Sequence, residues 1–371
     1  MADRATDIQN ITVAAPPIGI SKQRMEWIDA LRGFTMILVV AYHVSIQGFG
    51  ESEKASSALP LLVLFRMPLF FFISGFLAYK PDIHWTNNRL RMMIWKKIKI
   101  QVLPTIVFLF IAIVMLQPHL WDGIVYAFNS PTKSGYWFTW CLLQMFILYY
   151  LFEYAESRFT HRSWKPIAIL WFVALCCYAV LYMPSWFKFP KANEHTFLNA
   201  SGIVQVMRYF HFFILGNIVR RYWHKWQQLF DSRWFFPLVV FLVVICSADI
   251  FKWHNLRFQW TNLPRTITMY GMLLIVFMAF RYYQNTFTQQ HRIGRWLQYI
   301  GVRTLDIYLL HFLFLPNLKM VGEFINTNKK NFVIDITESV IIALLVIGFS
   351  LIISAVLRIS PLFRQYLFGR K

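Results

Sequence analysis

Charged residues are scarce in this sequence. Of 371 residues, 15% are charged and 57% are hydrophobic, whereas a soluble domain carries about 25% charged residues. The mean hydropathy is +0.46. This composition excludes an ordinary soluble globular protein and favours a chain that crosses a membrane several times.

Acidic residues and cysteines are also few. The 17 Asp and Glu residues face 37 Lys and Arg residues, which gives a net charge of +20. The basic residues form short clusters between apolar runs, which is typical of membrane topology signals and not of a phosphate-binding surface. We therefore expect no nucleic-acid partner. The four cysteines fall inside apolar runs and have no metal-ligand spacing, so we read them as small core residues and predict no metal site.

The first residues are polar and contain no apolar stretch of the kind found in a cleavable signal peptide. We expect residues 1–24 to be a short disordered cytosolic tail and residues 25–357 to be the membrane domain. Residues 358–371 are expected to be a basic cytosolic tail.

The sequence predicts an all-α, polytopic membrane helix bundle of about ten transmembrane helices. Each apolar run approaches the roughly 20 residues that a helix needs to cross a bilayer. The predicted spans are 30–49, 59–79, 100–117, 136–154, 165–183, 203–219, 234–251, 264–283, 299–316 and 334–357. With the N-terminus inside, the loops rich in Lys and Arg all fall on the cytosolic side. Both termini are therefore predicted to be cytosolic.

The first span contains three polar residues, Asp29, Arg32 and His43. A charged side chain at mid-membrane costs about 2.5–3.5 kcal/mol on insertion scales, so each one needs a reason. Arg32 and His43 are eleven residues apart, close to three helical turns, so they share a face and differ in depth by about 16 Å. Asp29 precedes Arg32 by one turn and can pair with it. Alternatively, Asp29 and Arg32 mark the helix end, and His43 is a hydrogen-bonded core residue.

The second span combines Arg66 and Pro68 with Ser74 and Gly75. Proline frees a backbone carbonyl, and a Ser-Gly pair permits close helix approach, so this helix is expected to line a cavity. Other buried polar candidates, for which an interhelical hydrogen bond is the alternative, are Arg208, His211, Asp249, Asp306 and His311. Thr304, Tyr308 and His311 have the i, i+4, i+7 spacing of one helical face.

Six short motifs resemble those of the integral membrane acyltransferase 3 family. They are Asp29 with Leu31-Arg32-Gly33 and His43, the run 67–76, the basic stretch 95–104, Tyr136-Trp137-Phe138, the run 212–216 and the run 307–311. They occur in the family's order over about residues 25–357. In the basic stretch, Ile100 and Gln101 stand where the family often has a second arginine. Some members carry a fused extracytoplasmic esterase-like domain, which we do not expect here.

The resemblance implies a reaction, a location and partners. An acyl group, usually acetyl from acetyl-CoA, is transferred to a hydroxyl of a cell-surface or lipid-linked carbohydrate. Succinyl transfer to periplasmic glucans is an alternative. The implied location is the bacterial inner (plasma) membrane, in contact with lipid. Acyl-CoA would be a co-substrate, with no tightly bound cofactor.

The residue types suit this chemistry. His43 is the candidate base or transient acyl carrier, because imidazole has the right pKa range, and Arg32 and Asp29 complete the candidate catalytic set. Candidate donor-binding residues are Arg66, Ser74, Arg89, Arg91, Lys96, Lys97 and Lys99. Coenzyme A carries phosphates that the cations would bind, although each cation has an alternative as a topology signal. Further pocket candidates are Trp137, Arg208, His211, Tyr308 and His311.

Two other functions compete with acyl transfer. A transporter or flippase would suit buried Arg and His residues, but the sequence shows no internal repeat of the kind that many transporters have. A glycan polymerase or ligase would normally have larger, more charged outer loops.

Overall fold

The structure of the chain is a computed structural model. It describes residues 25–51, 59–81, 83–116, 118–130, 132–158, 163–182, 196–250, 262–328 and 331–361, with Phe363 and Leu367. The predicted tail over 1–24, most of that over 358–371 and the side chain of Asp249 lie outside the described residues.

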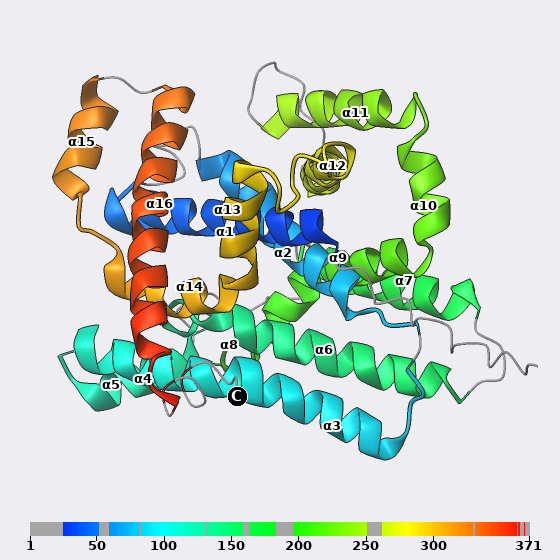
Figure 1. Cartoon of the computed structure of the whole chain (residues 1–371), viewed down its shortest axis with the longest axis horizontal. Helices are drawn as coiled ribbons and strands as arrows, with labels where there is room; N and C mark the ends of the chain where they lie inside the picture. Colours follow the sequence, from blue (N-terminus) through cyan, green and yellow to red (C-terminus); the bar gives the residue numbers. More distant parts are fainter. Residues whose placement is uncertain are drawn as a thin grey trace, which may run out of the picture.

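All regular elements in the described ranges are helices (Figure 1), as the all-α prediction requires. They are α1 (Glu26–His43), α2 (Leu59–Ala78), α3 (Asn87–Lys97), α4 (Leu103–Leu116), α5 (Leu120–Asn129), α6 (Trp137–Glu156), α7 (Trp164–Val180), α8 (Phe197–Ser201), α9 (Ile203–Arg221), α10 (Trp223–Phe230), α11 (Phe235–Ile250), α12 (Asn262–Tyr282), α13 (Arg292–Val302), α14 (Thr304–Leu310), α15 (Lys319–Asn328) and α16 (Phe332–Leu357). Two π-helical turns, η1 (Val44–Gly48) and η2 (Ile98–Val102), extend α1 and join α3 to α4. The 3-10 turns η3 (Lys133–Gly135) and η4 (His311–Phe314) precede α6 and follow α14.

Six described segments are long and apolar enough to cross a membrane. They are Glu26–Gly48, Leu59–Ala78, Asn87–Met115, Trp137–Glu156, Asn262–Tyr282 and Phe332–Leu357. A seventh would join α10 to α11 across a bend of 76°. Such segments make the chain a multi-pass membrane protein. The predicted count of about ten spans and the cytosolic position of both termini remain predictions.

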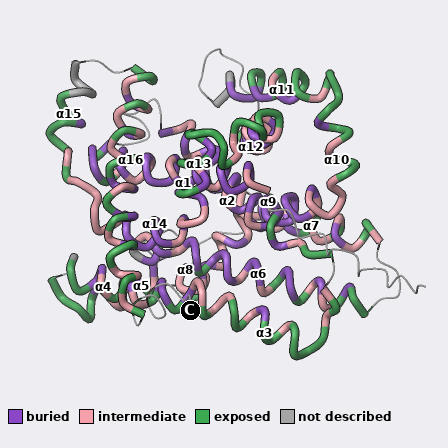
Figure 2. Tube along the Cα trace, viewed as in Figure 1, coloured by how far each residue is buried: buried purple, intermediate pink, exposed green. Residues whose placement is uncertain are grey.

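The core is built around α1, α2 and α9, where buried positions concentrate (Figure 2). Helices α2 and α9 cross closely because each has a glycine at the crossing. A Cβ on Gly75 would overlap the carbonyl of Phe213, and a Cβ on Gly216 would overlap the carbonyl of Phe72. Gly33 brings α1 equally close to the backbone of α13. The predicted close approach at Ser74-Gly75 is therefore present. Among the cysteines, Cys176 is exposed, so it is not the core residue that was predicted.

The predicted span over 299–316 is not one continuous helix. The backbone leaves helical geometry at Arg303, with φ −112° and ψ 17°, and the chain passes from α13 into α14. Helix α14 is then held against α16 by Asp306. Its Oδ2 accepts from the Ser354 hydroxyl at 2.8 Å and from Arg358 Nη2 at 2.6 Å. Asp306 therefore makes an interhelical contact, as its alternative interpretation predicted.

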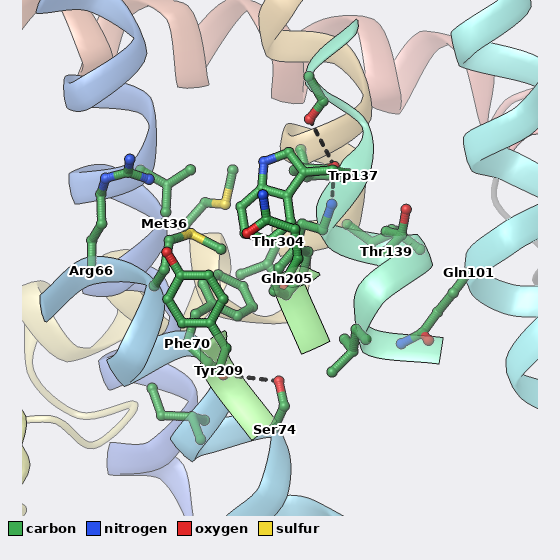
Figure 3. Close-up of a pocket in the computed structure, with 18 of the residues that line it drawn as sticks. Met36, Arg66, Phe70, Ser74, Gln101, Trp137, Thr139, Gln205, Tyr209 and Thr304 are labelled. Carbon is green, nitrogen blue, oxygen red and sulfur yellow. Dashed lines mark hydrogen bonds between the residues drawn. The ribbon is translucent and has the colours of Figure 1, made fainter. Parts of the chain in front are cut away.

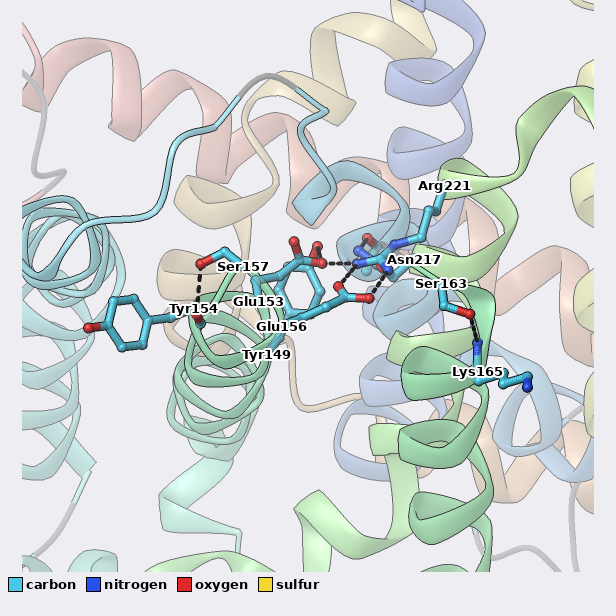
Figure 4. A network of polar contacts seen from close by, with 10 residues as sticks. Tyr149, Glu153, Tyr154, Glu156, Ser157, Ser163, Lys165, Asn217 and Arg221 are labelled. Atoms are coloured by element: carbon cyan, nitrogen blue, oxygen red, sulfur yellow. Dashed lines mark hydrogen bonds and ion pairs between the residues drawn. The ribbon is translucent and has the colours of Figure 1, made fainter. Parts of the chain in front are cut away.

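A buried ionic cluster joins the C-terminal ends of α6 and α9 (Figure 4). Arg221 donates to Glu156 at 3.0 and 2.9 Å and also to Glu153, whose Oε1 accepts from the Tyr149 hydroxyl at 2.9 Å. The ion-paired side chains are at most 5% exposed. Removing one partner of such a buried pair costs about 3–5 kcal/mol, because it leaves an uncompensated charge. The cluster therefore fixes α6 relative to α9.

Candidate functional site

One large cavity lies among α1, α2, α3, α6, α9 and α14 (Figure 3). Its volume is about 950 Å³, near the top of the range of about 300–1,000 Å³ for small-molecule sites. Both Arg32 and His43 line it. Because α1 is helical throughout this stretch, the cavity follows it for about 16 Å.

Four cations line one end of this cavity, which we call the basic end: Arg32, Lys80, Lys96 and Lys97. The Nζ of Lys97 lies 3.5 Å from the centroid of the Phe146 ring. The other three cations are close enough to Lys97 to repel its charge. Such a cluster is electrostatically costly without an anion, so this end is suited to a phosphate-bearing ligand.

Arg32 is oriented by two side chains. Its Nη1 donates to Asp29 Oδ1 at 3.2 Å, and its Nη2 donates to Thr304 Oγ1 at 3.0 Å. The predicted pairing of Asp29 with Arg32 is therefore present. Asp29 itself does not line the cavity, so it acts on the site through the arginine.

His43 is the last residue of α1 and directly precedes the π-helical turn η1, a type of irregularity that is frequent at functional sites. Its ring lies 4.8 Å from the ring of Phe312 and 5.2 Å from that of His311, measured between centroids. The guanidinium carbon of Arg66 lies 3.4 Å from the centroid of the Tyr42 ring. His43 therefore lines the cavity between aromatic rings.

The other two candidate histidines do not line the cavity. The Nδ1 of His311 lies 3.0 and 2.9 Å from the carbonyl oxygens of Ile307 and Tyr308. Both partners can only accept, so Nδ1 carries the proton. The buried Nε2 has no hydrogen-bond partner in the described part of the chain. His211 is fully buried, and its Nδ1 is hydrogen-bonded to the Tyr270 hydroxyl.

The structure divides the remaining predicted residues. Those that line the cavity are Arg66, Ser74, Lys96, Lys97, Trp137, Arg208 and Tyr308. Arg89, Arg91 and Lys99 are exposed and do not line it. Arg89 and Arg91 lie on α3 and Lys99 lies on η2, and these helical turns direct their side chains away from the cavity.

Several lining residues were not predicted from the sequence, among them Lys80, Gln101, Gln205 and Tyr209. Lys80 follows α2 and looks like a topology signal. Gln101 lies in the π-helical turn η2, which places its side chain at the cavity. No sequence pattern predicted this turn. Gln205 and Tyr209 are four residues apart on α9 and flank Arg208. Polar residues at this spacing in an apolar helix could have identified Gln205 and Tyr209 as candidate lining residues.

The charge of the lining has one sign. Six Lys and Arg side chains line the cavity, and none of its described lining residues is acidic. A low-dielectric wall strengthens the field of fixed charges. The cavity therefore favours anionic ligands along its length.

The chain matches one family profile and two curated relatives. The profile of the acyltransferase 3 family, described as an acyltransferase domain, matches residues 25–359. Glucans biosynthesis protein C of Salmonella gallinarum is 23% identical over 203 residues, which cover 52% of this chain and 47% of that protein. The protein of the same name from Escherichia coli is 24% identical over 228 residues, covering 54% of this chain and 59% of that protein. The chain thus spans about half the length of the curated relatives it matches. No solved structure matches it.

Proposed function

Because this chain belongs to the acyltransferase 3 family, we propose that it transfers an acyl group, in the first instance acetyl from acetyl-CoA, to a hydroxyl of a cell-surface or lipid-linked carbohydrate. The two matched relatives are named for glucan biosynthesis, which supports a carbohydrate acceptor. We place this reaction in the bacterial inner membrane, with acyl-CoA arriving from the cytosol.

The observation that carries this proposal is a single cavity that contains both a basic end and His43. In acyl-CoA, the phosphates and the thioester are separated by a long flexible arm. A separation of about 16 Å along α1 suits a donor whose phosphates bind Arg32, Lys80, Lys96 and Lys97 while its thioester reaches His43.

The proposed chemistry is direct transfer. The neutral His43 ring takes the proton of the acceptor hydroxyl as its oxygen attacks the thioester carbonyl carbon. The carbonyl oxygen then carries negative charge, which the buried Arg66 guanidinium stabilises. The carbon–sulfur bond breaks, and the departing sulfur receives the proton from His43. The products are the carbohydrate ester and coenzyme A.

Succinyl transfer is the second candidate, and the charge of the lining favours it. A succinyl group carries a carboxylate, and the cavity contains arginines beyond the basic end, Arg66 and Arg208, with no acidic residue among its described lining residues. An arginine binds a carboxylate through two parallel hydrogen bonds.

The proposal is tested with purified protein in detergent or vesicles. Acetyl-CoA and succinyl-CoA, each labelled in the acyl group, are incubated with glucose oligosaccharides, and the label is sought in the glycan. Transfer from either donor supports the proposed function and identifies the donor. Failure of both donors, in a preparation shown to be folded, would contradict it.

The basic end yields a second expected result. Replacing Lys96 and Lys97 by Gln should raise the KM for acyl-CoA at least about tenfold, because two charge-assisted phosphate contacts of about 1.5–3 kcal/mol each are lost. Lys99→Gln is the matched control, since Lys99 lies in the same stretch but does not line the cavity. Steady-state kinetics over a range of acyl-CoA concentrations checks this. Equal KM values in the double variant and the control would leave Lys96 and Lys97 as topology signals only.

A further inference from the structure

The part of the cavity wall formed by the first turns of α6 and α9 is aromatic. The rings of Trp137 and Tyr209 stack with centroids 5.8 Å apart and planes inclined by 26°. Tyr209 stacks in turn on Phe71, at 5.1 Å and 24°. Trp137 and Tyr209 both line the cavity, and Figure 3 shows them drawn together with Gln205. We call the set Trp137, Gln205, Arg208 and Tyr209 the aromatic end.

Polar groups accompany these rings. Gln205 and Arg208 lie on the same helix as Tyr209 and line the same cavity. The Nε of Arg208 is buried and has no hydrogen-bond partner in the described ranges. A buried donor without a partner is destabilising, so a ligand oxygen that accepts from this Nε would stabilise the arrangement.

The aromatic end is held rigidly. The carbonyl oxygen of Ser201, just before α9, accepts from Trp140 Nε1 and from Gln144 Nε2, both on α6, at 2.8 Å each. Lys133 Nζ, from the turn before α6, donates to the carbonyl oxygen of Ala200 at 2.8 Å. These three bonds fix the start of α9 against the start of α6, and so fix Gln205, Arg208 and Tyr209 relative to Trp137. Groups positioned in advance lose less entropy when a ligand binds.

The aromatic end adjoins His43 and not the basic end. Phe312, which packs on the His43 ring at 4.8 Å, also packs on the ring of Tyr136 at 5.6 Å. Tyr136 directly precedes Trp137. At the opposite end of α9 from Gln205, Arg220 Nη1 lies 3.7 Å from Met25 Sδ, beside the start of α1. His43 therefore lies between a basic end and an aromatic end.

We infer that Trp137, Gln205, Arg208 and Tyr209 form the acceptor subsite and hold one sugar ring of the carbohydrate beside His43. This inference rests on the proposed acyl transfer and extends it to the acceptor. The C–H face of a sugar ring packs on an aromatic ring, and its hydroxyls exchange hydrogen bonds with an amide, a guanidinium and a phenol. Donor and acceptor then approach His43 from opposite ends of one cavity.

Acceptor kinetics test this subsite. With acyl-CoA saturating and glucose oligosaccharides as acceptor, Trp137→Phe and Gln205→Ala should each raise the acceptor KM about three- to tenfold, as expected for one lost stacking or hydrogen-bond contact. The KM for acyl-CoA and the slow hydrolysis of acyl-CoA without acceptor should remain at wild-type values. Trp121→Phe is the matched control, because Trp121 is 72% exposed on α5 and does not line the cavity.

The outcomes separate this inference from the proposed function. If wild-type protein acylates the oligosaccharide and both variants retain its acceptor KM, the subsite is wrong and acyl transfer stands. If the KM for acyl-CoA rises by the same factor as that for the acceptor, the residues serve the whole cavity, and the inference also fails. If folded wild-type protein neither hydrolyses acyl-CoA nor transfers from it, the proposed function fails.

Discussion

A His43→Gln variant is expected to insert and fold normally and to lose acyl transfer by about 10²–10⁴-fold, the usual effect of removing a general base. Glutamine keeps much of the size and hydrogen-bonding capacity of histidine but takes up no proton near neutral pH. The ring of His43 packs against three neighbouring aromatic rings, those of Tyr42, His311 and Phe312. A structural histidine in this setting would tolerate glutamine, whereas a proton acceptor would not.

His211→Gln is the matched control, because His211 is a buried histidine that does not line the cavity. Transfer of label from acyl-CoA to glycan is measured for both variants, after gel filtration shows that each is folded. Near-normal turnover of His43→Gln would refute the catalytic assignment. Label that stays on wild-type protein when acceptor is omitted, and is absent from His43→Gln, would identify the ring as an acyl carrier instead of a base.

Gly216→Val is expected to abolish assembly of the folded bundle. A side chain at this position overlaps the backbone carbonyl of Phe72, and a backbone atom cannot be moved aside by a rotamer change. Overpacking usually costs about 1–3 kcal/mol when side chains can adjust, and here α2 and α9 would have to separate. Because these helices carry Ser74, Arg208 and Tyr209, the cavity would be lost with the crossing.

Gly348→Val provides the control for this substitution. Gly348 lies on the apolar helix α16, and a Cβ there meets no atom within 4 Å. The yield of monodisperse protein after detergent extraction distinguishes the two variants. A Gly216→Val protein as abundant and as heat-resistant as Gly348→Val would show that the crossing is not as close as described.

The sequence predicted the part of the site that depends on regular helix geometry. Arg32 and His43 line one cavity because α1 is uninterrupted between them. The same reasoning failed for His311, which was expected to share a face with Thr304 and Tyr308. Helix α14 ends at Leu310 and continues as a 3-10 turn, which rotates the imidazole away from the cavity.

Long-range packing explains most of what was missed. Nothing local marks Glu153 and Glu156 as partners of Arg221, since they lie more than 60 residues away along the chain. A rule that counts loop charges treats Lys80, Lys96, Arg89 and Arg91 in the same way. The two lysines line the cavity and the two arginines do not. Only the turn of α3 and the path of the chain after α2 distinguish these residues.

The positive lining of the cavity bears on the ion gradients across the membrane. A water-accessible space that extends far into a membrane is a potential leak for protons and sodium ions, which would dissipate the gradients stored across it. Fixed positive charges in a narrow passage raise the electrostatic barrier to cations. Arg32, Lys97, Arg66 and Arg208 all line this cavity, so the proposed route for an acyl donor and a carbohydrate acceptor also carries a barrier to small cations.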